Sequence, residues 1–402
     1  MQRILVLLFL LTSLSVTAAT FEGDIADWKE QPKEKFKDPE KNFKLVLSKI
    51  KKEFIDRELT DEELYRAATA GVLAALNSGN DKWNLLLSPR MLEDFNILMT
   101  RKLTGIGATL KMDPDLGVLK ILKLMPKSSG QLAGLQVDDI ILSVNGQKCK
   151  GKKLPAIAEL IRGPAGGNVN LKVLREDRVM NFNIARAAVE VPGVELQMVD
   201  AASALITIDQ FSQGTASQLA GQLAHLSDAK IKRLVLDLRS NDGGDFEEAV
   251  KSIEQFLSSG TTIVNARYGD GSVKEFKAHQ SPWRPDVKIV VLVSPQTSSG
   301  AELMSGALKD FRSAALVGST THGKWNGQVI ESLSNGFAIK YSVMHFETGK
   351  GNSYQGRGLT PDLETQALKD GEINTIQMES DIQKRLGIDA GLRAALQIPT
   401  LG

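Results

Sequence analysis

Val287–Gln328, VKIVVLVSPQTSSGAELMSGALKDFRSAALVGSTTHGKWNGQ, is the stretch that decides the fold of this chain. It opens with the apolar, β-branched run Val287–Val293, which is typical of a strand buried on both faces. A polar turn at Ser294–Ser298 follows, and apolar residues then recur on one helical face as far as Phe311. A second apolar strand is predicted at Ala314–Val317. This order of buried strand, helix and buried strand predicts a layered α/β domain.

Ser299 stands where the first strand passes into the helix. Backbone N–H groups point outward at such a junction and can hold the oxyanion that develops when a nucleophile attacks. Lys324 is expected at the end of the neighbouring strand. A lysine serves as a base for a serine hydroxyl only when it is neutral, which at pH 7 requires its pKa to fall by about 3.4 units. Burial beside apolar strands can supply that fall, and the amide of Gln328 could orient the amine.

Several motifs in this stretch resemble those of the carboxy-terminal processing proteases, a family of serine/lysine peptidases. The matching residues are Glu302, Gly306-Ala307-Leu308 with Asp310, Val317-Gly318, Thr321, Gly323-Lys324 and Gln328. The resemblance implies that Ser299 is the nucleophile, Lys324 the base and Gln328 the third member of the site. Ser298, directly before Ser299, remains a rival nucleophile.

Two departures from the family pattern affect this interpretation. The run Thr297-Ser298-Ser299-Gly300-Ala301 replaces the family's alternation of Ser and Ala, and Trp325 stands where the family has a small glycine. The tryptophan could exclude water from Lys324 or crowd the substrate. His322, two residues before the lysine, is either a neighbour of the site or a solvent-facing loop residue.

Composition limits the classes of function that remain. The chain has 402 residues, a formal net charge of +1 and an apolar fraction of 42%, so no global field favours nucleic acid. A single cysteine, Cys149, excludes an internal disulfide and a cysteine metal cage, and the four histidines lack ligand spacing. No metal and no organic cofactor is expected.

The amino terminus has the layout of a secretory signal peptide. Arg3 precedes an apolar segment, Ile4–Val16, and small residues follow at Ala18 and Ala19. We expect residues 1–19 to be a signal peptide and the protein to be exported, to the periplasm or another extracytoplasmic space. A membrane tether results only if this segment is retained.

Residues 20–100 are predicted to form an N-terminal helical region. One helix is expected from Asn42 to Phe54, and Thr60 with Glu63 forms a capping box that opens another. Val72 and Leu76 are predicted to lie on the buried side of that second helix, together with Leu64, Ala68 and Ala75.

A distinct module is predicted at residues 101–188. Its glycine turn, Gly105-Ile106-Gly107-Ala108, leaves backbone N–H groups available as a nest for a carboxylate. Together with Ala133-Gly134-Leu135, Asp138-Asp139-Ile140-Ile141 and Val144-Asn145-Gly146, this turn resembles a circularly permuted PDZ domain. The resemblance implies that the module adds a peptide's C-terminal residues as an extra strand.

Residues 189–366 are predicted to form the α/β protease core, and residues 367–402 a polar helical tail that packs on the N-terminal helices or on a second subunit. Strands are expected at Ala204–Ile208 and Leu234–Leu238. The predicted fold class is therefore a layered α/β serine-protease core with an N-terminal helical region and an inserted permuted PDZ domain.

The Gly243-Gly244 turn opens a helix after a strand and is a potential anion site. In the family, the motif that matches Asp237 to Gly244 supplies part of the oxyanion hole. The expected donors are one N–H of Gly243 or Gly244 and the N–H of Gly300.

The sequence predicts an exported serine endopeptidase that degrades proteins or processes their C-termini through a PDZ domain. Its expected partners are protein or peptide substrates, with an adaptor lipoprotein and a homo-oligomer as further possibilities and no nucleic acid. The alternative is a catalytically inactive PDZ adaptor with a degenerate protease core.

Overall fold

The computed structural model describes residues 37–77, 83–113, 118–227, 229–368 and 371–400. The signal peptide predicted over residues 1–19 lies outside the described residues. Among those that are described, no helix combines the length and apolar character that a membrane span requires. The chain divides into two units. The first holds Asp94–Gly327 and the residues from Met344 onward, and the second holds those up to Glu93 together with Gln328–Val343.

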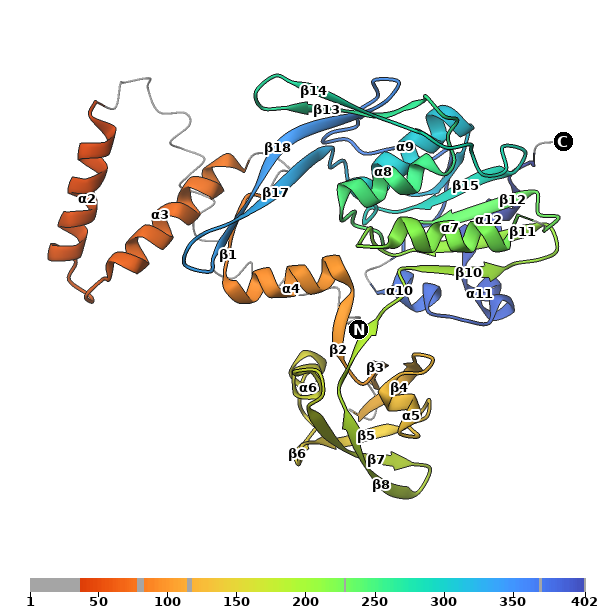
Figure 1. The fold of residues 1–402 in the computed structure, drawn as a ribbon, viewed down its shortest axis with the longest axis horizontal. Helices are drawn as coiled ribbons and strands as arrows, with labels where there is room; N and C mark the ends of the chain where they lie inside the picture. Colours follow the sequence, from red (N-terminus) through yellow and green to blue (C-terminus); the bar gives the residue numbers. More distant parts are fainter. Residues whose placement is uncertain (1–36, 78–82, 114–117, 228, 369–370, 401–402) are drawn as a thin grey trace. The chain divides into compact units, whose positions relative to one another are not determined.

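A six-stranded sheet of order β10-β11-β12-β15-β16-β19 forms the centre of the first unit (Figure 1). Its strands are β10 (Val194–Met198), β11 (Ser203–Ile208), β12 (Arg233–Asp237), β15 (Lys288–Val293), β16 (Ala315–Gly318) and β19 (Leu363–Glu364). All pairs are parallel except β10 with β11. Parallel sheets require cover on both faces, and every residue of β12 and β15 after the first is accordingly buried. The layered α/β core predicted from the sequence is confirmed.

Helices cover both faces of this sheet. Ile289 and Val291 of β15 belong to an apolar cluster that also contains residues of α7 (Thr215–His225), α8 (Phe246–Glu254) and α9 (Gly300–Arg312). Val290 and Leu292 alternate with them and belong to a second cluster on the opposite face. A strand that is apolar on both faces therefore separates two cores.

The second face is covered by the C-terminal tail, which contains α10 (Glu372–Gln377), α11 (Ile382–Ile388) and α12 (Ala390–Gln397). Helix α12 contacts β12, β15 and β16, and its residues Leu392 and Ala395 are fully buried. The sequence had suggested the N-terminal helices or a second subunit as the partner of this tail. The sheet is the partner because it presents apolar side chains on both faces.

A separate antiparallel group is built from β13 (Thr262–Tyr268), β14 (Val273–Lys277) and the C-terminal part of β18 (Ala338–Thr348). Trp325 is fully buried in the core cluster, and its ring lies 5.3 Å from those of Phe346 and Tyr354. A side chain without exposed surface cannot crowd a substrate, so the structure assigns Trp325 to packing.

The predicted PDZ module forms a sheet of order β3-β4-β5-β7-β8, with β6 paired to β5. Its elements are β3 (Ala108–Asp113), β4 (Val118–Leu124), α5 (Ser129–Leu132), β5 (Ile140–Val144), β6 (Gln147–Lys148), α6 (Leu154–Ile161), β7 (Asn168–Arg175) and β8 (Arg178–Ala185). The chain segments that enter and leave the module pair antiparallel as β2 (Lys102–Gly105) and β9 (Ala187–Glu190).

The two helices predicted near the N-terminus are α2 (Pro39–Glu53) and α3 (Asp61–Leu76), and the second unit also contains β1 (Leu85–Leu87) and most of β17 (Asn326–Ser332). Helix α4 (Pro89–Thr100) begins in the second unit and continues into the first from Asp94 onward. The capping box of Thr60 and Glu63 is confirmed. The predicted buried face of α3 is wrong, because Val72 is 65% and Leu76 54% exposed whereas Leu73 is buried. Helix α3 packs on β1, so only part of its apolar surface is covered by the described residues.

The docking of the tail predicts unequal effects for two apolar residues of that segment. Leu392→Ala should lower the free energy of unfolding by about 2–5 kcal/mol, because a fully buried leucine leaves a cavity. Ile388→Ala, at a position that is 54% exposed, should change it by less than about 0.5 kcal/mol. Urea unfolding measures both values. Equally small effects would contradict the packing of α12 on the sheet.

Candidate active site

Ser299 has a strained backbone at the turn from β15 into α9. Its φ of 54° and ψ of −118° lie outside the regions that residues with a side chain normally adopt, at a cost of about 1–3 kcal/mol. Serine nucleophiles are presented in this way on sharp turns between a strand and a helix. Ser298, the rival, has no positive φ, is 5% exposed and donates its N–H to the carbonyl of Asn241 at 3.0 Å. The geometry favours Ser299.

Glu302 joins the serine turn to the lysine loop. Its carboxylate is fully buried, and Oε2 accepts the backbone N–H of Ser299 at 3.0 Å and that of Lys324 at 2.7 Å. The other oxygen, Oε1, accepts the Thr321 hydroxyl at 2.5 Å and the Gly323 N–H at 2.7 Å. A buried carboxylate needs such donors, since an unpaired one is costly to bury. One side chain therefore fixes the main chain of both predicted catalytic residues.

Lys324 is 9% exposed and stands between two closely packed neighbours. Gly323 has a φ of +86°, and a Cβ at this position would lie 2.8 Å from the Gly358 nitrogen, so only glycine fits. On the other side, the Trp325 N–H donates to Gln355 Oε1 at 2.5 Å. The loop around the lysine is thus held on both sides.

The glycine turn after β12 approaches the serine directly. A Cβ on Gly243, whose φ is +103°, would lie 2.8 Å from the Cβ of Ser299 and 3.2 Å from the Gly300 nitrogen. The N–H of Gly243 is already donated to Asn241 Oδ1 at 2.9 Å. Within the described residues, the N–H groups of Gly244 and Gly300 make no hydrogen bond. Of the predicted oxyanion donors, these two remain available in this conformation.

Three hydrogen bonds fasten the loop that carries the glycine turn to the loop before Ser299. The hydroxyls of Ser294 and Thr297 donate to the carbonyls of Arg239 and Leu238, at 2.5 and 2.9 Å, and the Ser298 N–H donates to Asn241 as described above. The His322 N–H donates to the carbonyl of Thr297 at 3.0 Å. The predicted nucleophile and the predicted oxyanion donors therefore lie on loops that are hydrogen-bonded to each other.

The predicted third member, Gln328, belongs to the second unit and is described within it. It lies on β17, and its Nε2 donates to the hydroxyl of Ser342 at 3.3 Å. The structure brings together the other predicted residues of this site, which are Ser299, Lys324, Gly243, Gly244 and Gly300.

The predicted peptide-binding turn of the PDZ module joins β2 to β3. Gly105 ends β2, Ala108 begins β3, and Gly107 has a φ of +69°. The carbonyls of Ile106 and Gly107 accept the N–H groups of Gly130 and Met125, both at 2.8 Å. The N–H groups of Ile106 and Gly107 make no hydrogen bond within the part of the chain that the structure describes. Two adjacent free donors in such a turn form a nest for an anion.

Glu302 belongs to a recognised sequence motif, but no role was predicted for it from the sequence. A signal was present, because a glutamate three residues after the serine that begins a helix has capping-box spacing. The contacts with Thr321, Gly323 and Lys324 could not be read from local spacing, since they join loops that follow different strands.

Comparison with known proteins gives a family match for two segments of the chain. Residues 202–365 match Peptidase family S41, and residues 120–175 match the PDZ domain. A protein of Staphylococcus epidermidis described as a CtpA-like serine protease is 28% identical over 338 residues, which are 84% of this chain and 67% of that protein. One of Staphylococcus saprophyticus with the same description is 28% identical over 382 residues, covering 94% and 76%.

A solved structure shares the fold. A protein from Bacteroides fragilis described as an S41 protease superposes with a TM-score of 0.55 at 17% identity, covering 83% of this chain and 93% of that one. These findings confirm the predicted PDZ domain and the resemblance to the carboxy-terminal processing proteases.

The position of Glu302 leads to a prediction about the reactivity of the serine. Glu302→Gln replaces one acceptor oxygen by a donor, so at least one buried N–H or hydroxyl loses its partner, at a cost of about 1–3 kcal/mol. We expect covalent labelling by a fluorophosphonate to slow at least about tenfold as the turn loses its geometry. Glu247→Gln, on the exposed side of α8, is the matched control. Equal labelling rates in the two variants would refute the role of Glu302.

Proposed function

We propose a function for this chain from one premise: it is a member of peptidase family S41. It is a serine peptidase of the carboxy-terminal processing type and contains a PDZ domain. We infer that it is an exported endopeptidase that captures the C-terminal end of a protein with its PDZ domain and cleaves that protein with Ser299 and Lys324. Residues 1–19 act in this proposal as the signal peptide, and the periplasm or another extracytoplasmic space is the site of action.

The single observation that carries this proposal is the shared anchoring of Ser299 and Lys324. Both donate their backbone N–H to the same oxygen of the buried Glu302, and Ser299 has the strained backbone of a presented nucleophile. A protein that only binds peptides has no need to hold a strained serine beside a buried lysine. For this reason we favour catalysis over the inactive adaptor.

The proposed reaction begins with proton transfer from the Ser299 hydroxyl to the neutral amine of Lys324. The serine oxygen attacks the substrate carbonyl, and the N–H groups of Gly244 and Gly300 stabilise the resulting oxyanion. The C–N bond breaks as Lys324 returns the proton to the leaving amine. Water, deprotonated by the same lysine, then hydrolyses the acyl-enzyme. Gln328 remains the proposed third member of the site.

Each of the expected domains has a separate role in the proposed function. Residues 101–188 receive the substrate tail, whose carboxylate binds to the N–H groups of Ile106 and Gly107 while the Gly105–Ala108 turn lines the added strand. Residues 189–366 cleave the substrate, residues 20–100 are the N-terminal region, and residues 367–402 are the C-terminal tail. An adaptor lipoprotein and self-association remain proposed partners, and no metal or organic cofactor takes part.

The catalytic assignment is tested by cleavage of an unstructured protein. Ser299→Ala and Lys324→Ala should each lower kcat/KM by about 10⁴-fold, because a nucleophile and its base act as a unit. Ser298→Ala is the matched control and should retain most of the activity, since only the neighbouring serine has the presented backbone. Cleavage that persists in Ser299→Ala and disappears in Ser298→Ala would reverse the assignment.

The role of the PDZ domain is tested with two peptides that differ only at the C-terminus. Amidation removes the charge that the Ile106 and Gly107 donors bind, so KM should rise about tenfold while kcat changes little. KM is also measured for a third peptide, in which the internal sequence near the tail is scrambled, and is compared with the values for this pair. An unchanged KM after amidation would show that the substrate enters elsewhere.

A further inference from the structure

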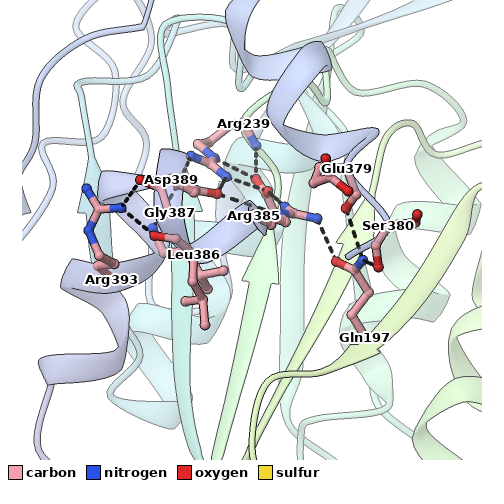
Figure 2. Close-up of polar contacts among 11 residues, drawn as sticks. Gln197, Arg239, Glu379, Ser380, Arg385, Leu386, Gly387, Asp389 and Arg393 are labelled. Atoms are coloured by element: carbon pink, nitrogen blue, oxygen red, sulfur yellow. Dashed lines mark hydrogen bonds and ion pairs between the residues drawn. The ribbon is translucent and has the colours of Figure 1, made fainter. Parts of the chain in front are cut away.

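A buried cluster of ion pairs lies at the end of β12, directly before the glycine turn. Arg239 donates to Asp237 from Nε at 2.9 Å and from Nη2 at 2.7 Å. It also donates to Asp389 from Nη1 at 2.8 Å and from Nη2 at 2.6 Å (Figure 2). Arg385 donates to Asp237 Oδ2 at 2.7 Å and to Gln197 Oε1 at 2.9 Å. Two of these charged residues, Arg385 and Asp389, come from the C-terminal tail.

The cluster is charge-balanced and excluded from solvent. The side chains of Asp237 and Asp389 have no exposed surface, and those of Arg239 and Arg385 are 4% and 1% exposed. Burial acts to raise the pKa of Asp237, but the two guanidinium groups outweigh it and hold that pKa below its ordinary value. A buried ion cluster is costly to form, so its presence alone is weak evidence that it stabilises the fold.

The backbone of Arg239 connects this cluster to the reacting groups. Its N–H donates to Asp237 Oδ1 at 3.2 Å, and its carbonyl accepts the hydroxyl of Ser294, which lies on the loop that leads to Ser299. The next residues lead to Gly244, whose N–H is a proposed oxyanion donor. A shift of the Arg239 side chain would therefore be transmitted to both loops of the site.

We propose that Arg385 and Asp389 are positioning residues for the reaction, and that the C-terminal helices thereby complete the active site. Because the tail supplies Asp389, the guanidinium of Arg239 is held by hydrogen bonds between Asp237 and Asp389. This arrangement fixes the turn that presents the Gly244 N–H to the oxyanion. The proposal rests on the proposed function. It adds that catalysis depends on two side chains that follow the S41-matching segment, residues 202–365, in the sequence.

The test compares turnover per active site in three variants. Asp389→Asn keeps an oxygen that can accept the Leu392 N–H, which caps α12, but removes the charge that binds Arg239. Because an unbalanced buried charge can unfold a domain, Arg385→Gln combined with Asp389→Asn removes one charge of each sign and leaves the Asp237–Arg239 pair neutral. Arg393→Gln is the control: the side chain of this exposed residue of α12 donates to the carbonyls of Leu386 and Gly387 (Figure 2), and its backbone N–H, which the substitution keeps, donates to the carbonyl of Asp389.

Active sites are counted by titration with a fluorophosphonate, and kcat and KM are then measured per titrated site. A purely structural role lowers the number of competent sites, whereas a positioning role lowers the turnover of each one. We expect kcat per titrated site to fall at least about tenfold in both cluster variants, with KM nearly unchanged and Arg393→Gln like wild type.

Turnover per titrated site within about twofold of wild type in both cluster variants would overturn the proposal. A wild-type turnover that does not depend on Ser299 would instead overturn the proposed function, and this inference with it. The wild type and Ser299→Ala are therefore measured in the same series, so that the two failures can be told apart.

Discussion

The burial of one carboxylate constrains the whole site. Glu302 has no exposed surface, and a carboxylate in that position persists only when several donors surround it. The donors come from the turn of Ser299 and from the loop of Thr321, Gly323 and Lys324, so satisfying Glu302 brings these two segments together. Glu302 also maintains the strained backbone of Ser299, because the Ser299 N–H is one of the donors that the carboxylate accepts.

The parallel sheet explains why these loops meet. The glycine turn follows β12, Ser299 follows β15 and Lys324 follows β16, and parallel neighbours in an α/β sheet end at the same edge. Helix α9 buries one face of the sheet and α12 the other, so the loops rest on a support that is packed from both sides. The C-terminal tail therefore helps to support the sheet whose strands lead into these loops.

Local patterns in the sequence predicted the elements that carry the chemistry. The apolar run at Val287–Val293 and the helix after it were predicted because a doubly buried strand is apolar throughout. The short strands β10 and β14 were not, since neither has an extended apolar run. The docking of the tail was missed because Arg385 and Asp389 look like solvent-exposed residues until their long-range partners are known. The burial of these two residues depends on contacts between segments that are distant in the sequence. Such contacts leave no periodic pattern in the local sequence.

If the buried carboxylate of Glu302 presents one particular serine for attack, a serine-directed phosphonate should react with that serine alone. The wild-type protein is treated with the phosphonate, and the adduct is located by peptide mass spectrometry. We expect a single modified residue, Ser299, with the adjacent Ser298 unmodified. An adduct on Ser298, or no adduct under conditions in which the protein cleaves its substrate, would contradict it.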